Sequence, residues 1–475
     1  MNILYAASEA VPYAASGGLA DVAGSLPRAL NDAGQDCRVV LPLYKNVKPE
    51  LRDGLEFVTN FTVDVGWRRQ YCGVFKGAQN GVTYYLLDNE YYFGRDGLYG
   101  FYDDCERFVF LSRAIMEMLK HIGWKPEIIN CNDWQTALVP VYYNVFYKYQ
   151  YGYDNIKTVF TIHNIQYQGQ YGQEILEDVF GIPNYESQLL EYDRCVNLMK
   201  GAIECANWVS TVSPTYAQEI LDPWFAHRLD PIPRERSWKL SGILNGIDVV
   251  NYDPEKDAAL YANYTKEDKK NKAVNKEKLQ ERLCIEVNPD LPLIGMVTRL
   301  VSHKGLDLVK DAVDDIMQNT NAQFVILGSG DLEYENYFKW MQEKYPGRFV
   351  LCLGFVPELS RKIYAGADIF LMPSKSEPCG LSQMIALRYG TIPVIRETGG
   401  LRDSITDSGD GEGNGFTFQT YNAGDMLHSI HRAIDAYNSD KKGWAVLVDR
   451  AMGCDNSWGK SANEYIRLYR QILKS

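Results

Sequence analysis

The chain opens with a short apolar run, a glycine-containing loop and an amphipathic segment. Residues 2–8 have the pattern of a strand, residues 19–34 carry apolar side chains at helical spacing, and residues 37–44 form a second apolar run. Strands that are apolar throughout and alternate with helices are typical of a parallel sheet covered on both faces. Further runs of this kind occupy residues 127–133, 157–164 and 207–213. The pattern predicts one doubly wound α/β domain over residues 1–245.

A second series of apolar runs follows a charged, helix-prone segment at residues 253–283. These runs recur at intervals of about 25 residues and occupy residues 293–300, 322–330, 348–355, 367–374, 391–397 and 414–418. They predict a second Rossmann-like domain over residues 246–455, with a C-terminal helix at 456–475. Two such domains would face each other across a cleft at the carboxyl ends of their strands, where open α/β sheets bind ligands.

Composition and charge narrow the classes of partner. The 475 residues are 46% apolar and 23% charged, which is ordinary for a folded chain. The 49 Lys and Arg against 61 Asp and Glu give a net charge of −12, which repels nucleic acid and anionic lipid. The N-terminus lacks the basic and apolar parts of a leader, and no apolar run of about 18 residues occurs. We expect a cytoplasmic protein with neither nucleic acid nor membrane as a partner, and a homo-oligomer is compatible with the sequence.

The cysteines and histidines give little support for a metal site. The ten cysteines form no CxxC pair, and the six histidines include no HExxH pattern. We therefore expect reduced thiols and no bound metal or cofactor.

Two glycine pairs lie where a predicted strand passes into a predicted helix. Gly17 and Gly18 open the first helix, and Gly399 and Gly400 stand at a later turn. Glycines there let backbone N–H groups approach an anion, although such pairs are as often plain turns. The patterns GxGxxG and GxxxxGK[ST] are absent, which disfavours an ordinary dinucleotide enzyme and a Walker-type ATPase.

Three charged residues follow predicted strands of the second domain. Arg299 and Lys304 share one loop and could clamp a diphosphate, or could simply be solvated. Glu377 lies between a strand and a helix, where it would project into the cleft or cap the turn.

Polar residues also end two strands of the first domain. His163 and Asn164 follow the run TVFTI, and Asp133 and Trp134 follow EIINCN. An acid beside an aromatic ring suits a sugar, whose hydroxyls take hydrogen bonds and whose C–H face takes a ring. The alternatives are a structural histidine, a core tryptophan and a helix-capping aspartate.

The ordered motifs resemble those of the bacterial glycogen synthase and plant starch synthase family from residue 1 to about 470. The strings that carry the resemblance include SEAVPYAASGGLADV, INCNDWQTAL, TIHNIQYQG, KLSGILNGID, TRLVSHKGLDL, EPCGLSQM and RYGTIPVIRETGGLRD. The resemblance implies a GT-B fold and a retaining transfer of glucose from the co-substrate ADP-glucose to the non-reducing end of an α-1,4-glucan, without a metal. It also implies that the C-terminal helix crosses back to the first domain.

The resemblance assigns roles residue by residue. It places Arg299 and Lys304 on the donor phosphates, Glu377 near the transferred glucose and His163 beside the anomeric centre. Other donor-binding residues would be Gly17, Gly18, Asn245, Phe355, Cys379, Gly380, Leu381, Thr398, Gly399 and Gly400. Acceptor-binding residues would be Glu9, Asp21, Asp133, Trp134 and Asn164.

The sequence departs from the family pattern at three places. The family's K-T-G-G-L loop has Ala15 and Ser16 here, an aromatic before the acid is replaced by Ser376, and a usual glycine is Arg228. The missing lysine leaves two alternatives open: a donor such as UDP-glucose, or a non-catalytic glucan-binding or regulatory relative.

Overall fold

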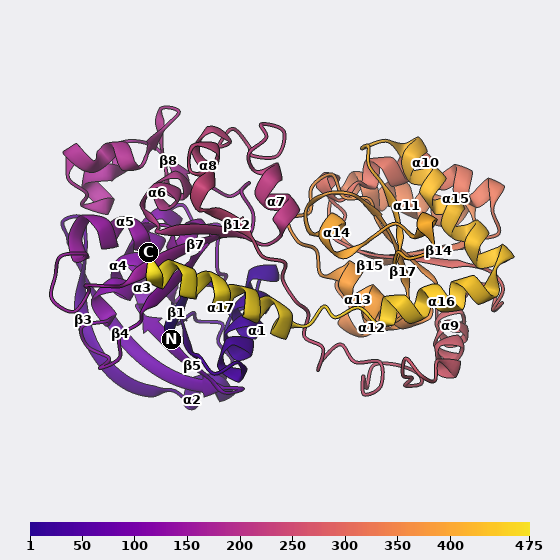
Figure 1. Cartoon of the computed structure of the whole chain (residues 1–475), viewed down its shortest axis with the longest axis horizontal. Coiled ribbons are helices and arrows are strands. Elements are labelled where there is room, and N and C mark those ends of the chain that lie inside the picture. The colour runs from indigo at the N-terminus through magenta and orange to yellow at the C-terminus, as the bar shows by residue number, and fades with distance from the viewer. The chain divides into compact units, whose positions relative to one another are not determined.

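The computed structural model describes residues 1–475, except for the side chain of Asp410. The chain forms two compact units (Figure 1). Unit 1 comprises residues 1–212, 217–243 and 458–475, and unit 2 comprises residues 213–216 and 244–457. The C-terminal helix α17 (Trp458–Lys474) thus belongs to unit 1, where it packs beside α1 (Gly18–Asp32).

Unit 1 is built on a nine-stranded sheet in the order β12-β11-β7-β6-β1-β2-β5-β4-β3. Its strands are β1 (Asn2–Ala6), β2 (Asp36–Pro42), β3 (Glu56–Val65), β4 (Arg68–Gln79), β5 (Val82–Asp88), β6 (Ile128–Asn132), β7 (Lys157–Ile162), β11 (Trp208–Thr211) and β12 (Leu240–Gly242). A small antiparallel sheet contains β8 (Gln170–Tyr171), β9 (Glu191–Tyr192) and β10 (Cys195–Asn197). The helices besides α1 and α17 are α2 (Pro49–Asp53), α3 (Glu90–Phe93), α4 (Asp104–Met118), α5 (Leu138–Tyr142), α6 (Leu198–Cys205) and α8 (Pro231–Glu235), and α7 (Pro214–Glu219) contains residues of both units.

The edge of this sheet differs from the prediction, which contained parallel strands alone. β4 pairs antiparallel with both β3 and β5, so a hairpin extends the parallel sheet. Val65 pairs with Arg68 across a two-residue turn in which Gly66 adopts a φ of 56°. Such tight turns require left-handed residues, which glycine adopts without strain. Many β3 side chains are exposed, so this strand lacks the continuous apolar run that marks the buried strands.

Unit 2 contains a six-stranded sheet whose strands are all parallel, in the order β15-β14-β13-β16-β17-β18. The strands are β13 (Leu293–Val297), β14 (Gln323–Gly328), β15 (Phe349–Leu353), β16 (Ile369–Met372), β17 (Ile392–Arg396) and β18 (Phe416–Phe418). The helices are α9 (Lys270–Arg282), α10 (Leu306–Asn319), α11 (Leu332–Lys344), α12 (Pro357–Gly366), α13 (Ser382–Arg388), α14 (Gly399–Ser404), α15 (Ala423–Ser439) and α16 (Lys441–Met452). The doubly wound fold class predicted from the sequence is confirmed in this sheet.

Both sheets reverse their winding direction at one point. In unit 2 the chain winds outward from β13 to β15, returns to β16 on the other side of β13, and then winds the opposite way. In unit 1 the equivalent reversal separates β1 from β6. The loops at the carboxyl ends of such neighbouring strands diverge, and ligands bind in the crevice that this leaves.

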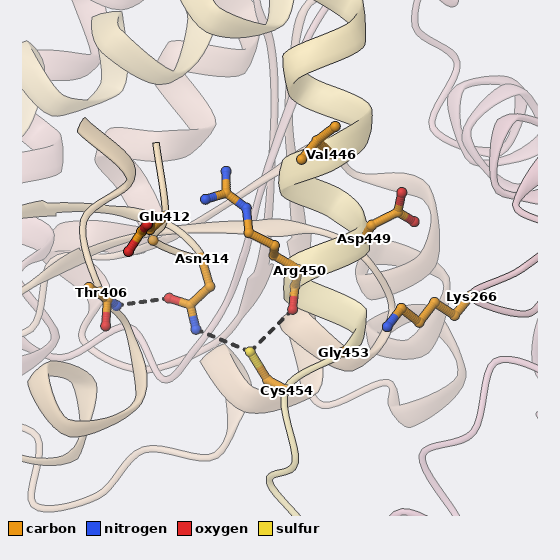
Figure 2. Close-up of a pocket in the computed structure, with 10 residues that line it drawn as sticks. Lys266, Thr406, Glu412, Asn414, Val446, Asp449, Arg450, Gly453 and Cys454 are labelled. Atoms are coloured by element: carbon orange, nitrogen blue, oxygen red, sulfur yellow. Dashed lines mark hydrogen bonds between the residues drawn. The ribbon is translucent and has the colours of Figure 1, made fainter. Parts of the chain in front are cut away.

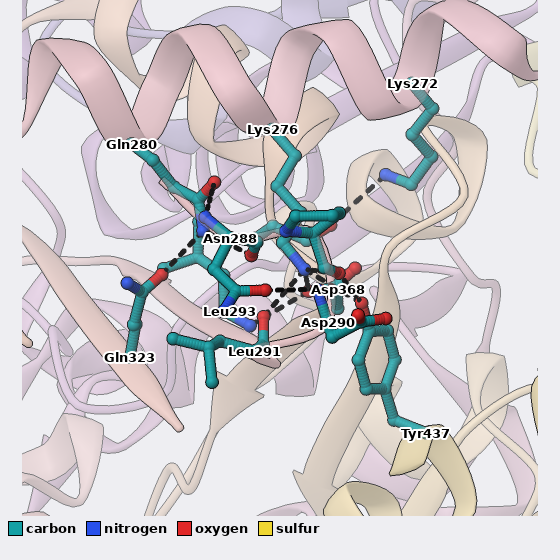
Figure 3. Close-up of polar contacts among 12 residues, drawn as sticks. Lys272, Lys276, Gln280, Asn288, Asp290, Leu291, Leu293, Gln323, Asp368 and Tyr437 are labelled. Carbon is teal, nitrogen blue, oxygen red and sulfur yellow. Dashed lines mark hydrogen bonds and ion pairs between the residues drawn. The ribbon is translucent and has the colours of Figure 1, made fainter. Parts of the chain in front are cut away.

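The charged segment that the sequence placed between the two sheets packs into unit 2. Lys272, Lys276 and Gln280 project from one side of α9, as their spacing of four residues requires (Figure 3). The Lys276 ammonium lies 2.7 Å from the Asp368 carboxylate and also donates to the carbonyl of Leu291. The Lys272 ammonium donates to three carbonyl oxygens and a threonine hydroxyl. These long side chains donate hydrogen bonds to buried acceptors that apolar residues would leave unpaired.

Removing the Lys276 ammonium should destabilise unit 2. The side chains of Lys276 and Asp368 are only 7% and 11% exposed, so K276M would leave a buried carboxylate without its cation. We expect a loss of about 3–5 kcal/mol in the free energy of unfolding. The control is K278M on the same helix, where the pair with Glu281 keeps 44% and 46% of its side-chain surface exposed and should contribute less than about 1 kcal/mol. Equal midpoints for the two variants in thermal unfolding would contradict this assignment.

Candidate functional site

The charged residues of unit 2 gather on two loops at the winding reversal. Arg299 and Lys304 lie between β13 and α10, and Glu377 lies between β16 and α13. Lys304 Nζ approaches Glu377 Oε2 to 2.6 Å, and the Ser374 hydroxyl donates to the same oxygen at 3.1 Å. The lysine and glutamate side chains are 19% and 10% exposed, so the pair is only slightly solvated. The structure thus brings Lys304 and Glu377 into direct contact.

His303 lies on the loop that carries the two cations. His303, next to Lys304, has a lowered pKa because burial and the neighbouring Lys304 and Arg299 cations disfavour its protonated form. The backbone N–H of Lys375 donates to the His303 carbonyl at 2.9 Å, which fastens the loop after β16 to the loop after β13. The guanidinium of Arg396, at the end of β17, donates to the Lys375 carbonyl at 2.8 Å. Three neighbouring strands therefore hold the loop of Glu377.

The second glycine pair lets backbones approach this loop. Gly399 has a φ of 43°, and a Cβ added there would lie 2.0 Å from the Glu377 carbonyl oxygen. The Gly400 N–H donates to the carbonyls of Glu377 at 3.2 Å and Pro378 at 3.1 Å. The amide of Gly400 therefore supports the Glu377 loop in this structure, where the sequence predicted an anion-binding group. A larger residue at 399 would push the loop away.

The other predicted donor residues of unit 2 surround these loops. Gln383 donates to the carbonyls of Cys379 and Gly380 and holds the turn between them, in which Gly380 has a φ of 71°. Burial raises the pKa of the Cys379 thiol to about 12, so the thiol stays protonated. Leu381 precedes α13, Thr398 is buried beside Gly399, Asn245 is 5% exposed, and Phe355 is 91% exposed after β15.

The first glycine pair faces an acid of its own unit. Gly17 precedes α1 and Gly18 begins it. The Glu9 carboxylate accepts the Ser16 N–H at 2.5 Å, and the Gly17 amide also stabilises this carboxylate. Burial nevertheless raises the pKa of Glu9. The anion at this helix N-terminus is therefore supplied by the chain, and Ala15 beside it is exposed.

Asp133, His163 and Asn164 meet at the carboxyl ends of β6 and β7. Asp133 Oδ1 accepts the His163 N–H at 2.7 Å and the Asn164 N–H at 3.4 Å. Its side chain does not cap the following helical turn, so the capping alternative is wrong. Burial, and to a smaller extent the nearby Glu9, raises the pKa of Asp133 to about 7, although the two backbone N–H groups act to lower it. Asp133 also has a φ of 55° and a ψ of −177°, a strained conformation for a residue with a Cβ.

His163 is neutral at physiological pH. Its ring is surrounded by packed atoms although part of the residue is exposed, and burial lowers its pKa to about 3. Asn132 Oδ1 lies 2.9 Å from His163 Nε2. Asn132 was not among the site residues predicted from the sequence; its position directly before Asp133, at a strand end, is the signal that could have found it.

Three further residues of unit 1 were named in the sequence analysis: Trp134, Asp21 and Arg228. Trp134 is half-buried, with its ring edge-on to Phe108 at 5.1 Å between centroids and 6.1 Å from Tyr171. Asp21 is exposed on the first turn of α1. Arg228 replaces a family glycine at a φ of 73°, which explains why glycine is usual there.

A cavity of about 660 Å³ in unit 2 contains none of the predicted site residues (Figure 2). It lies beside the C-terminal end of α16, where Asn414 donates to Cys454 and Arg450 projects nearby. The residues that line it are Lys266, Thr406, Glu412, Gly413, Asn414, Val446, Asp449, Arg450, Gly453 and Cys454.

The described residues include no cluster of three or more His, Cys, Asp or Glu side chains that could hold a metal ion. Within the same residues, none of the helices has the length and apolarity needed to cross a bilayer.

Replacing Asp133 by Asn tests the burial of this carboxyl. Asparagine keeps an oxygen for the His163 N–H but removes the charge. Because the pKa of Asp133 rises from 3.8 to about 7 on folding, the folded wild type binds more protons than the unfolded chain in that window. Its free energy of unfolding therefore falls as pH rises from 4 to 7. D133N should escape this loss, so its stability relative to wild type should grow by up to about 1.4 kcal/mol per pH unit.

Denaturant unfolding at several pH values measures this difference. The exposed D32N variant serves as the control and should show no such trend. If the difference in the free energy of unfolding between D133N and the wild type stays constant from pH 4 to 7, Asp133 ionises normally in the folded chain.

Two sequence profiles match the chain. The profile of the starch synthase catalytic domain matches residues 2–235, and that of glycosyl transferases group 1 matches residues 278–442. A glycogen synthase from Clostridium botulinum is 48% identical over 477 residues, which cover 99% of each chain. A glycogen synthase from Bacillus cereus is 48% identical over 478 residues, which cover 100% of each chain.

Solved structures give the same result. The catalytic domain of starch synthase IV from Arabidopsis thaliana, bound to ADP and acarbose, has a TM-score of 0.91 and 35% identity, with 100% of this chain and 99% of that chain covered. A sucrose-phosphate synthase from Thermosynechococcus elongatus, at 16% identity and a TM-score of 0.61, shares the fold. The family resemblance and the GT-B fold inferred from the motifs are thus confirmed, and the chain belongs to the glycogen and starch synthase family of glucan-elongating glycosyltransferases.

Proposed function

We propose that this enzyme transfers glucose from ADP-glucose to the non-reducing 4-hydroxyl of an α-1,4-glucan, with retention of configuration and without a metal. The observation that carries the proposal is the contact between Lys304 and Glu377 at the winding reversal of unit 2, with Arg299 on the same loop. A cation and an acid therefore lie in contact at the position where doubly wound sheets bind nucleotides. The ADP bound to the starch synthase IV structure supports the choice of nucleotide.

The charges of unit 2 suit the departure of a nucleoside diphosphate. As the glycosidic bond breaks, negative charge develops on the leaving phosphate, and fixed cations stabilise it most where water is scarce. In this proposal Arg299 and Lys304 bind the diphosphate, which is the task that Mg²⁺ performs in other transferases. Glu377 lies near the transferred glucose, and the turn from Cys379 to Leu381 with Thr398, Gly399 and Asn245 completes the donor site. The exposed ring of Phe355 stacks on the base.

The groups of unit 1 suit a neutral sugar. His163 is uncharged, and Asp133 holds the backbone of His163 and Asn164 in place. Trp134 offers part of a ring face, and Asp21 and Glu9 complete the acceptor side. In the proposed reaction, the glucose of a sugar nucleotide bound to unit 2 must reach the sugar bound by these residues of unit 1.

The first glycine loop says less about the identity of the sugar nucleotide than the other motifs do. Ala15 supplies no ammonium, and Glu9 already occupies the Ser16 amide. Donor binding through the Gly17 amide therefore requires Glu9 to share that amide. Because the family's lysine is missing, UDP-glucose remains the second candidate donor. The non-catalytic alternative loses support, because the chain matches glycogen synthases along its whole length.

The first test compares donors in the presence of EDTA. With glycogen as primer, glucose incorporation from ADP-glucose should proceed with chelator present and should exceed that from UDP-glucose. R299A and K304A should each lower kcat/KM by about a hundredfold or more, because each removes roughly 2.7–4 kcal/mol of transition-state stabilisation. The control K310A removes a partly exposed cation paired with Glu333 on the next helix and should keep wild-type activity. Full activity in K304A would overturn the proposed donor site, and loss of activity with EDTA would overturn the metal-free mechanism.

The second test restores the family's lysine. If the first glycine loop faces the donor phosphates, A15K should add a charge-assisted hydrogen bond worth about 1.5–3 kcal/mol. The KM for ADP-glucose should then fall by roughly tenfold to a hundredfold. The control A33K adds the same charge at the other, exposed end of α1 and should leave the KM unchanged. An inactive A15K with intact folding would instead favour a loop rebuilt for another donor.

A further inference from the structure

Asn132 makes a fully paired set of hydrogen bonds beneath His163. It is the last residue of β6 and is completely buried. Its amide nitrogen Nδ2 donates to the carbonyl of Ala6 on β1 at 2.9 Å and to the carbonyl of Asn130 at 3.2 Å. Its oxygen Oδ1 lies 2.9 Å from His163 Nε2. Both hydrogens of the side-chain amide are therefore used by two carbonyl oxygens.

These partners fix the orientation of the Asn132 amide. Rotating the amide by half a turn would point Oδ1 at two carbonyl oxygens, which are acceptors only, and would replace two hydrogen bonds by contacts between acceptors. Leaving a buried polar atom without a partner destabilises the fold. The group that faces His163 Nε2 is therefore an acceptor.

An acceptor at this position determines where the ring proton lies. A carboxamide oxygen cannot donate, so the hydrogen bond requires a proton on Nε2. The ring is neutral because burial lowers the pKa of His163 to about 3, and a neutral imidazole carries one proton. The other nitrogen, Nδ1, then has a lone pair and is left without a hydrogen-bond partner among the residues that the structure describes.

We infer that Asn132 is a positioning residue, which holds His163 as the Nε2–H tautomer so that Nδ1 accepts a hydrogen bond from a hydroxyl of the bound sugar. Asn132 acts through His163 and does not contact the substrate. The inference rests on the proposed function for the role of His163 in the reaction, but the tautomer itself follows from contacts within unit 1. A ring with its proton on Nδ1 would present a donor to the sugar, and the hydrogen bond would reverse or be lost.

Nitrogen NMR of the full-length chain with labelled histidine tests the tautomer directly. The chain has six histidines, and H163Q identifies the signals of residue 163. In the wild type, the correlations between ring nitrogens and ring C–H protons should show a proton on Nε2 and none on Nδ1, unchanged from pH 5 to 8. A proton on Nδ1, or a ring that titrates within this range, overturns the inference without any variant.

Two alanine variants on the same strand test the role of Asn132 in the reaction. N132A removes the acceptor, so His163 should become a mixture of tautomers and kcat should fall by about tenfold, as expected for one hydrogen bond lost in the transition state. The control N130A also removes a fully buried asparagine, whose oxygen accepts from the Thr161 hydroxyl, whereas the side-chain partner of His163 Nε2 is Asn132. N130A should leave the tautomer and kcat unchanged.

The results separate this inference from the proposed function. Equal losses of kcat in N132A and N130A, or an unchanged tautomer in N132A, overturn the positioning role. A changed tautomer with wild-type kcat also overturns it, because the reaction would then be indifferent to the ring. If the wild type transfers glucose from no sugar nucleotide, the proposed function fails, while the NMR measurement still decides which nitrogen carries the proton.

Discussion

The reversal of winding direction in each parallel sheet is the constraint on which the candidate site depends. In unit 2 the reversal lies between β13 and β16, and in unit 1 it lies between β1 and β6. Loops that follow neighbouring strands at such a point turn to opposite sides of the sheet and leave a crevice. Lys304 and Glu377 follow the first pair of strands, and Glu9 and Asp133 follow the second. The fold thus brings together residues that lie far apart in the sequence before any ligand is bound.

Charge at these positions must be paired or neutralised, because both crevices are poorly solvated. Unit 2 pairs the Glu377 carboxylate with Lys304 and the Ser374 hydroxyl. In unit 1, burial instead disfavours the charged forms: it raises the pKa of Asp133 and Glu9 and lowers that of His163. This difference in charge between the two units agrees with the proposed function, in which unit 2 binds the anionic sugar nucleotide and unit 1 binds the neutral sugar chain.

Much of this arrangement could be read from the sequence, because buried parallel strands are apolar throughout and their ends are easily located. Arg299, Lys304, Glu377, Asp133 and His163 were predicted from such strand ends. The hairpin of β3 and β4 was missed, because exposed side chains interrupt its pattern. The charged, helix-prone segment that contains α9 was predicted, but the burial of its lysines was not, since lysine is seldom buried and its partners, among them Asp368, are distant in sequence.

Other features of the site depend on partners that no local pattern reveals. The sequence suggested that the amides of both glycine pairs bind an external anion. In the structure, Gly400 donates to the loop of Glu377, and Glu9 accepts from Ser16. Asn132 likewise looks like an ordinary strand residue until its contacts with β1 and His163 are known. In each case the packing of a neighbouring strand decides which group a polar atom contacts.

The most direct test is a double-mutant cycle in which Lys304 and Glu377 are replaced singly and together. The affinity of each variant for ADP is measured by isothermal titration calorimetry. If the Lys304 ammonium is shared between Glu377 and the diphosphate, E377Q should tighten ADP binding by about tenfold, because the lysine no longer has a competing carboxylate. The effect should shrink markedly in the K304A background, which reveals the coupling between the two side chains. The same change in affinity in both backgrounds, or no effect of K304A on ADP binding, would contradict the assignment of this ion pair to the donor site.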